Sequence, residues 1–202
     1  MHLVVLVHGF HGSPSDFGFI RECFARMQAV TVCPEHQYDV LVIQSNATRA
    51  FITHDGIDSG GTRVANEVCD HLSRRDLTYW QSISVIGHSL GGMYARYAVH
   101  ILNERGILDK LRPISFITLS TPHMGSRQHG RIWSETMCDA VSEHVLGRTG
   151  QQLMLLDTIR CDSPESPISD PAELLATPSG VPLLVSMTCS PIIDALRRFP
   201  VL

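Results

Sequence analysis

The stretch Val85-Ile86-Gly87-His88-Ser89-Leu90-Gly91-Gly92, VIGHSLGG at residues 85–92, decides the fold. It carries the pattern Gly-x-Ser-x-Gly between an apolar run that predicts a strand and a run from Leu90 that predicts a helix. In that setting the serine lies on a strained turn, and strand and helix leave no space for a Cβ at either flanking glycine. A plain surface turn would not require this context, so we interpret Ser89 as a nucleophile.

Apolar runs rich in β-branched residues recur along the first 120 residues, and their near-continuous character is typical of strands buried on both faces of a parallel sheet. They are HLVVLV at 2–7, DVLVIQ at 39–44, SISVIG at 82–87 and ISFITLS at 114–120. Helical patterns separate them at 13–28, 59–75 and 90–106. This alternation predicts an α/β fold with an open, doubly wound, mainly parallel sheet.

The pattern is weaker after Ser120. Residues 149–159 form an amphipathic helix candidate, and the proline-rich stretch 161–182 predicts an ordered loop, with a lid as the alternative. Asp58 or Ser59 is a candidate cap for the helix at 59–75.

Composition limits the classes of function. At 202 residues, with 44% hydrophobic and 18% charged residues, the chain fits one domain over 1–202. A net charge of -4 without any charged block disfavours a nucleic-acid partner. The six cysteines lack metal-site spacing, so we expect no metal and no cofactor. The apolar run LVVLV is too short for a transmembrane segment or signal peptide, which favours a cytoplasmic location.

A glycine-rich turn, VHGFHGS at 7–13, follows the first predicted strand. In a sheet of this type it lies beside the serine turn, where acyl transfer needs two N–H donors aimed at the developing oxyanion. The backbone amides of Phe10 and Leu90 are the predicted pair. An ordinary turn or a phosphate-binding loop is the alternative, but the glycine spacing of phosphate loops is absent.

Five stretches, in this order, resemble the lipase-like serine esterases of the α/β-hydrolase superfamily, a eukaryotic group catalogued as a domain of unknown function. They are VVLVHGFHGS, ATRAFITHDGIDSGGTRVANEV, VIGHSLGGMYARYAV, FITLSTPHMGS and LRRF. The resemblance covers most of residues 3–199. It implies hydrolysis of ester or lipid acyl-ester bonds, with Ser89 as nucleophile and Phe10 with Leu90 as the oxyanion hole. The implied partner is a lipid or other ester substrate, and peripheral membrane contact is left open.

The resemblance also implies further strands after the Thr-Pro-His turn, one followed by an acid and one by a histidine, in the chain order Ser, Asp, His. The sequence departs from this pattern because its last histidine is His144. The acids between Ser89 and that histidine are Asp109, Asp139, Glu104, Glu135 and Glu143. These are poor choices; Asp139 and His144, for example, lie in one predicted helix.

Asp194 would be a candidate acid if VPLLVSM at 181–187 formed a strand, but the resemblance makes 181–199 helical. We therefore expect the catalytic acid and base to lie outside these 202 residues, in a domain that is incomplete at its C-terminus and lacks the last strands. An internal base remains the alternative, and its candidates are His123, His129 and His144.

The remaining histidines are interpreted as structural. We expect His8 to fix the oxyanion loop, His88 to point away from the nucleophile, and His123 to make a structural hydrogen bond. We interpret the others as surface or partly buried residues: His2, His11, His36, His54, His71 and His100. A truncated or degenerate hydrolase domain that binds acyl ligands or a partner is the second functional hypothesis, and a thioesterase or acyltransferase the third.

Overall fold

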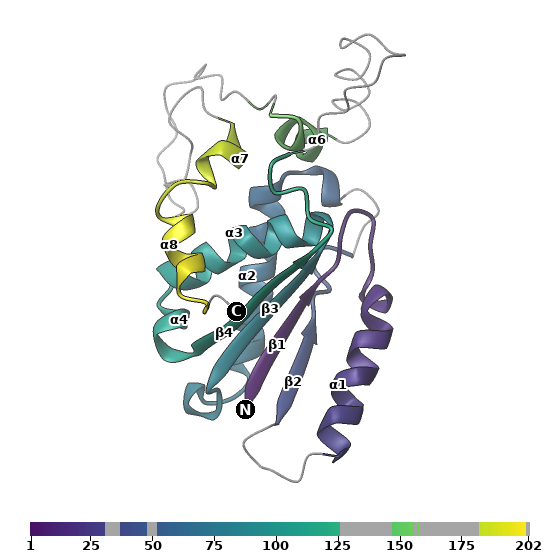
Figure 1. Cartoon of the computed structure of the whole chain (residues 1–202), viewed down its shortest axis with the longest axis vertical. Helices are drawn as coiled ribbons and strands as arrows, with labels where there is room; N and C mark the ends of the chain where they lie inside the picture. Colours follow the sequence, from purple (N-terminus) through teal and green to yellow (C-terminus); the bar gives the residue numbers. More distant parts are fainter. Residues whose placement is uncertain (31–36, 48–51, 126–146, 156, 158–181, 201–202) are drawn as a thin grey trace.

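In the described residues, four parallel strands form the centre of the computed structural model (Figure 1). The structure describes residues 1–30, 37–47, 52–125, 147–155, 157 and 182–200. The strands are β1 (His2–Val7), β2 (Tyr38–Val42), β3 (Ser82–His88) and β4 (Arg112–Leu119). All four predicted strands are confirmed, with small shifts at their ends.

The sheet has the order β2-β1-β3-β4, so the chain reverses direction across the sheet between β2 and β3. β1 and β3 are therefore neighbours although about 80 residues separate them, and their register pairs Val7 with Gly87. The loops that follow these two residues leave the same edge of the sheet at the same height. In open α/β sheets this point of reversal is where ligands bind.

The helices of the first half are α1 (Gly18–Val30), α2 (Ile57–Ser73), α3 (Leu90–Glu104) and the short α4 (Ile107–Lys110). The three helices predicted between the strands are present as α1, α2 and α3, with shifts at their ends, and α4 was not predicted. The 3-10 turns η1 (Pro14–Phe17) and η3 (Ile52–His54) precede α1 and α2, and η4 (Leu77–Tyr79) precedes β3. The predicted cap of α2 is wrong, because Gly56 caps the helix and Asp58 lies in its first turn.

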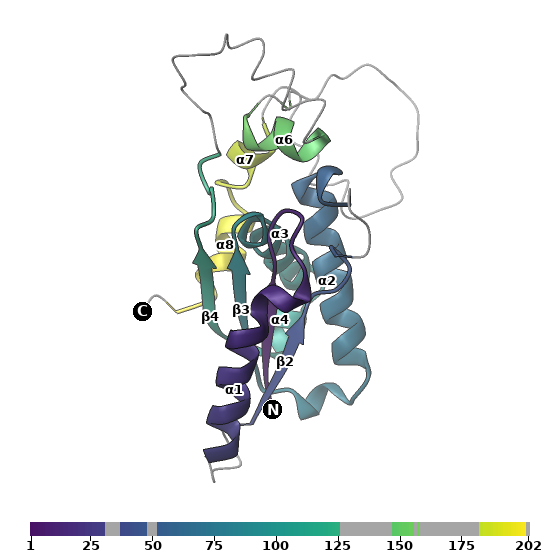
Figure 2. The ribbon, with the colours of Figure 1, turned by 90° about the vertical axis from the view of Figure 1, so that its right-hand side faces the viewer.

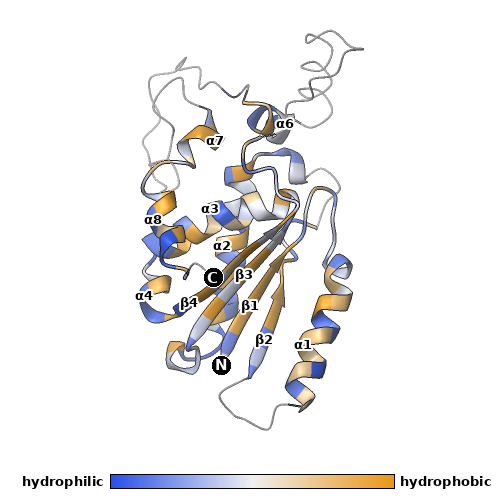
Figure 3. Cartoon of the chain, in the orientation of Figure 1, coloured by the Kyte–Doolittle hydropathy of each residue, from blue (hydrophilic) through white to orange (hydrophobic). Residues whose placement is uncertain are grey.

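Alternate residues of β1 face opposite sides of the sheet, and both sides are covered by helices (Figure 2). Val4 and Leu6 pack with Phe17 and Val42 under η1 and α1. The other face forms the larger core with α2 and α3. Strands buried on both faces are apolar along most of their length, as the orange colouring of β1 and β3 shows (Figure 3). The predicted doubly wound sheet is confirmed.

The second half of the chain adds short helices: α6 (Gly147–Leu153), α7 (Leu183–Ser186) and α8 (Ile192–Arg197). The helix predicted at 149–159 is thus α6, which begins and ends earlier. Residues 183–186 are helical, as the resemblance implied. α6 and α7 lie beyond the carboxyl ends of the strands in both views (Figures 1 and 2). None of the described helices is long and apolar enough to cross a bilayer.

Two glycines let α2 approach α3 closely. A Cβ on Gly60 would lie 2.7 Å from Cζ of Tyr94 and nearer still to other ring atoms, and a Cβ on Gly61 would lie 2.7 Å from Cβ of Tyr97. The Tyr94 ring is fully buried, and its hydroxyl donates to the Thr53 carbonyl at 3.2 Å. Burial raises the pKa of Tyr94 above its ordinary value.

We predict that Gly60→Ala lowers the free energy of unfolding by roughly 1–3 kcal/mol, because the anchored Tyr94 ring must move to admit a methyl group. Urea denaturation measures this change. Gly18→Ala is the matched control, since a Cβ there meets no atom within 4 Å and the residue already has helical backbone angles. We expect this control to gain about 0.5–1 kcal/mol. Equal stabilities of the two variants would contradict the packing argument.

Candidate active site

Ser89 occupies a strained turn between β3 and α3. Its backbone angles are φ 54 and ψ -129, a positive-φ conformation that costs a non-glycine residue about 1–3 kcal/mol. Three hydrogen bonds hold it there. The Ser89 N–H donates to the Leu119 carbonyl at 2.8 Å, while the Ser89 carbonyl accepts from the Gly92 N–H at 3.0 Å and from the Thr121 hydroxyl at 2.9 Å. The turn is thus pinned by the end of β4 and the segment after it.

The glycines of the motif lie where backbones nearly touch. A Cβ on Gly87 would lie 2.7 Å from the Gly92 nitrogen, and a Cβ on Gly91 would lie 2.7 Å from the His8 carbonyl carbon. Real Cβ atoms essentially never approach other atoms so closely. Strand and helix therefore have the close approach that the sequence predicts.

The glycine-rich turn after β1 lies against the nucleophile turn. A Cβ on Gly9 would lie 2.9 Å from Cβ and 3.4 Å from Oγ of Ser89. The Gly9 carbonyl accepts from the Gly12 N–H at 3.1 Å and from Nδ1 of His8 at 3.2 Å. Since His8 is fully buried, its hydrogen bond fixes the shape of this loop. The structure thereby brings the Gly9–Phe10 backbone to the serine.

The two predicted donors belong to the start of α3 and to the loop after β1. Leu90 is the first residue of α3, where N–H groups have no partner within the helix and the helix dipole favours negative charge. The Phe10 amide follows Gly9 directly. A pair of amides here suits an oxyanion, and their assignment stays a prediction from the sequence.

The Thr-Pro-His turn supports the site from the side of β4. Nε2 of His123 lies 2.9 Å from the hydroxyl of Thr118, a residue that pairs with Gly87 in the sheet. Burial, and then the charge of Arg96, lower the pKa of His123, so the ring is neutral at pH 7. This hydrogen bond is the structural contact that the sequence predicts for His123.

The candidate acids among the described residues lie away from the serine. Asp109 belongs to α4, which precedes the amino end of β4, and pairs with Arg198 at 2.6 Å. Glu104 ends α3, about 20 Å from its start at 1.5 Å per residue. Asp194 pairs with Arg197 at 3.0 Å. The remaining candidates lie outside the described residues: His129, His144, Asp139, Glu135 and Glu143.

Within the described part of the chain, the Ser89 hydroxyl makes no hydrogen bond to a histidine or an acid. The described residues also contain no group of three or more His, Cys, Asp or Glu side chains that could hold a metal ion. His88 is exposed beside the nucleophile. The described structure therefore contains Ser89, the predicted nucleophile, and its backbone surroundings.

Two features near the site were missed by sequence reasoning. Nε2 of His11 lies 2.7 Å from Nε2 of His54, and the Phe10 ring stacks on His11 and meets the His54 ring at a tilt of 39°. Asp157 accepts a hydrogen bond from the Leu183 N–H at 2.9 Å, and burial raises the pKa of its carboxyl. No motif spacing signals either contact, because the partners are 43 and 26 residues apart.

A parallel sheet with a strained Gly-x-Ser-x-Gly turn after a central strand and a glycine loop beside it has the architecture of an α/β-hydrolase core. The chain belongs to the family described as "Putative serine esterase (DUF676)", which its residues 1–176 match.

Relatives of the chain in Saccharomyces cerevisiae have lipase names. "Putative lipase ROG1" is 29% identical over 201 residues, which are 98% of this chain and 25% of that protein. "Putative lipase YDL109C" is 31% identical over 166 residues, 81% of this chain and 24% of that protein. The chain therefore spans about a quarter of the length of the relatives it matches.

Solved structures with similarity to the chain include a lipase and a thioesterase. The mature lipase BlEst2 of Bacillus licheniformis is 21% identical with a TM-score of 0.43, over 74% of this chain and 53% of that one. RedJ, a thioesterase from the prodiginine biosynthetic pathway of Streptomyces coelicolor, is 19% identical with a TM-score of 0.42, over 72% and 52%.

The strain at Ser89 predicts an unusual order of stabilities. Ser89→Gly should be more stable to urea than Ser89→Ala by about 1 kcal/mol, because glycine tolerates positive φ while alanine keeps the Cβ. At the exposed Ser15, which does not have a positive φ, the same pair of substitutions should give the opposite order. An alanine variant at position 89 as stable as the glycine variant would show that the turn is unstrained.

Proposed function

We propose that this chain carries the nucleophile of a serine hydrolase that cleaves carboxylic esters through an acyl-enzyme on Ser89. The observation that carries the proposal is the contact between the Gly9 backbone and the strained Ser89 turn, which would bring two amides and one hydroxyl to the same substrate carbonyl. This arrangement suits a reaction in which negative charge develops on the carbonyl oxygen as the oxygen of the serine attacks.

The reaction then runs in two halves. Oγ of Ser89 attacks the ester carbonyl and its proton passes to a general base, while the amides of Phe10 and Leu90 donate to the oxyanion. The tetrahedral intermediate collapses, the ester C–O bond breaks, and the base returns the proton to the departing alcohol. Water then attacks the acyl-enzyme, the base takes its proton, and the acid product leaves as Ser89 regains its proton.

The general base and its orienting acid belong to residues outside the described part of the chain. Among the described candidates, His123 is bonded to Thr118, and Asp109 and Asp194 are paired with arginines. A serine hydroxyl without a base is a weak nucleophile. The proposal therefore requires a histidine from elsewhere to reach the carboxyl edge of the sheet, where Ser89 lies.

We propose lipid acyl esters as the substrate class. The relatives with lipase names support this choice, and two exposed apolar side chains on the segments after β4 are compatible with it. Met124, in the turn after β4, is 85% exposed, and Val185 of α7 is 43% exposed. Exposed apolar side chains of this kind suit an acyl chain or the peripheral contact with a membrane surface that a lipid substrate would require.

A domain that binds acyl ligands without turnover is the second candidate, and the described part of the chain favours it in one respect, since no described base contacts Ser89. The esterase and the binding domain differ in the rate at which they would hydrolyse an ester. In serine proteases the oxyanion hole and binding alone leave only about 10³- to 10⁴-fold acceleration over water. Labelling of the serine by a reactive probe separates them.

We expect a fluorophosphonate probe to label wild-type protein on Ser89 and to leave Ser89→Ala unlabelled, since the probe reacts with an activated serine. Intact-mass spectrometry over time measures the rate at which the probe is attached. Equally poor labelling of both proteins would exclude the esterase function for this chain.

Gly9→Ala tests the oxyanion loop separately. Its methyl group would push the loop away from Ser89, and loss of one oxyanion donor slows the reaction about 10²- to 10³-fold. Gly18→Ala, which places the same methyl group in open space, should label at the wild-type rate. Normal labelling of Gly9→Ala would remove Phe10 from the proposed oxyanion hole.

A further inference from the structure

Two polar side chains of α6 are buried, although the helix lies beyond the carboxyl ends of the strands. Thr149 is 0% exposed and Gln152 is 2% exposed. The Thr149 hydroxyl donates to the Thr53 carbonyl at 2.7 Å and accepts from the Gly56 N–H at 3.0 Å. Oε1 of Gln152 accepts from the Ile57 N–H at 2.5 Å. Because a buried polar group without a partner costs free energy, α6 is matched to the segment from η3 to the start of α2.

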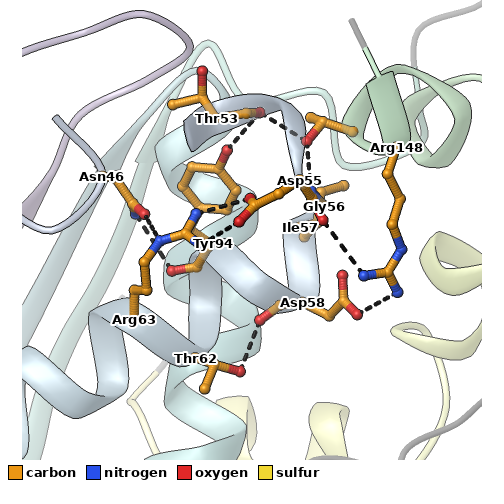
Figure 4. A network of polar contacts seen from close by, with 12 residues as sticks. Asn46, Thr53, Asp55, Gly56, Ile57, Asp58, Thr62, Arg63, Tyr94 and Arg148 are labelled. Carbon is orange, nitrogen blue, oxygen red and sulfur yellow. Dashed lines mark hydrogen bonds and ion pairs between the residues drawn. The ribbon is translucent and has the colours of Figure 1, made fainter. Parts of the chain in front are cut away.

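The Thr149 hydroxyl has a special place in this contact. It joins the Thr53 carbonyl to the N–H three residues later, which is the pair that a tight turn joins directly. The same carbonyl accepts from the Tyr94 hydroxyl at 3.2 Å (Figure 4). Next to Thr149, Arg148 forms an ion pair with Asp58 at 2.6 Å (Figure 4). η3 is therefore held by α3 through Tyr94 and by α6 through Thr149.

The first residue of α6 also lies against η3. A Cβ on Gly147 would lie 2.8 Å from the His54 carbonyl oxygen and 3.2 Å from the His54 Cβ. Gly147 has a positive φ of 57, a conformation that glycine adopts without steric cost. The backbones of α6 and η3 thus approach each other too closely for a methyl group between them.

η3 reaches the oxyanion loop through the ring of His54. The Phe10 ring lies 4.8 Å from the His54 ring, and the His11 ring lies 4.9 Å from it. The residue before Phe10 is Gly9, where a Cβ would lie 2.9 Å from the Cβ of Ser89. A displacement of η3 would therefore change the support of the Phe10 backbone beside Ser89.

The other end of α6 has a support that does not depend on η3. A Cβ on Gly125, in the turn after β4, would lie 2.6 Å from the Leu153 carbonyl oxygen. In the same turn, the Thr121 hydroxyl donates to the Ser89 carbonyl at 2.9 Å. α6 thus contacts η3 at one end and the turn that holds the serine at the other, so it can fix the position of η3 relative to Ser89.

We propose that Thr149 is a positioning residue of the oxyanion loop: its hydroxyl fixes η3, and η3 holds Phe10 beside Ser89 through the ring of His54. This inference rests on the proposed function for its catalytic meaning, since the Phe10 amide matters there as an oxyanion donor. It assigns a role in the reaction to a side chain that does not touch the substrate and follows Ser89 by 60 residues.

Thr149→Val tests the hydroxyl, because valine keeps the shape of threonine and removes both hydrogen bonds. We expect fluorophosphonate labelling of Ser89 at saturating probe to slow about tenfold, within the 10²- to 10³-fold that one oxyanion donor is worth. The probe concentration that gives half of the maximal rate should stay unchanged. Thr149→Ser restores the hydroxyl and should label near the wild-type rate. Circular dichroism verifies that every variant is folded at the temperature of the assay.

Gly147→Ala tests the same contact without removing a hydrogen-bonding group, and it decides the inference if Thr149→Val does not fold. Its methyl group would push η3 away from α6, so labelling should slow and the Phe10 amide should move. Gly106→Ala is the matched control, since Gly106 also has a positive φ, 68, but a Cβ there meets only a carboxylate oxygen of Asp109 at 3.7 Å. This control should label at the wild-type rate.

A second readout observes the loop without any reaction. In the full chain with ¹⁵N-labelled phenylalanine, the Phe10 amide resonance should shift in Thr149→Val and in Gly147→Ala, and it should stay near its wild-type position in Thr149→Ser and Gly106→Ala. An unshifted Phe10 resonance in the folded valine and alanine variants at positions 149 and 147 overturns the inference. If the resonance shifts as expected but wild type is not labelled, the positioning of the loop stands and the proposed function fails.

Discussion

The rest of the structure depends on the parallel pairing of β1 with β3 in a register that sets Val7 opposite Gly87. This pairing releases two loops from the same edge of the sheet at the same height, so that backbone meets backbone without side chains between them. Gly91 lies against the carbonyls of Val7 and His8, and Gly9 lies against Ser89. A single side chain at either glycine would separate the loops, because the gap is narrower than a methyl group requires.

The strained serine is a consequence of the same arrangement. A positive-φ serine costs free energy, and it persists only because its surroundings fix both its neighbours. The turn is preceded by the buried strand β3 and followed by α3, which is buried along most of its length. The Ser89 N–H also donates a hydrogen bond to the carbonyl of Leu119, the last residue of β4. Burial of the two cores thus offsets the strain, and the hydroxyl is presented at the edge of the sheet by rigid elements.

Local chemistry made part of this fold predictable. The strands and the nucleophile turn follow from apolar runs and from glycines at fixed offsets, which act over a few residues. The contact of His11 with His54 and the anchoring of η3 by Thr149 join residues 43 and 96 positions apart, through side chains common on any surface. The apolar run at 181–187 could be interpreted as a strand, whereas the family resemblance implied a helix there. Periodicity alone cannot decide between the two, because so short an apolar run has no distinct period.

The capping of α2 shows why the later part of the chain matters for the site. α2 is capped by Gly56, which has no side chain to accept a hydrogen bond, so the first N–H groups of the helix need other partners. They find them in α6: the Gly56 N–H donates to the Thr149 hydroxyl at 3.0 Å, and the Ile57 N–H donates to the side-chain Oε1 of Gln152 at 2.5 Å. Because η3 immediately precedes this cap, α6 also determines where the residues of η3 lie. The segment after Ser89 therefore also determines how α2 begins and where η3 lies.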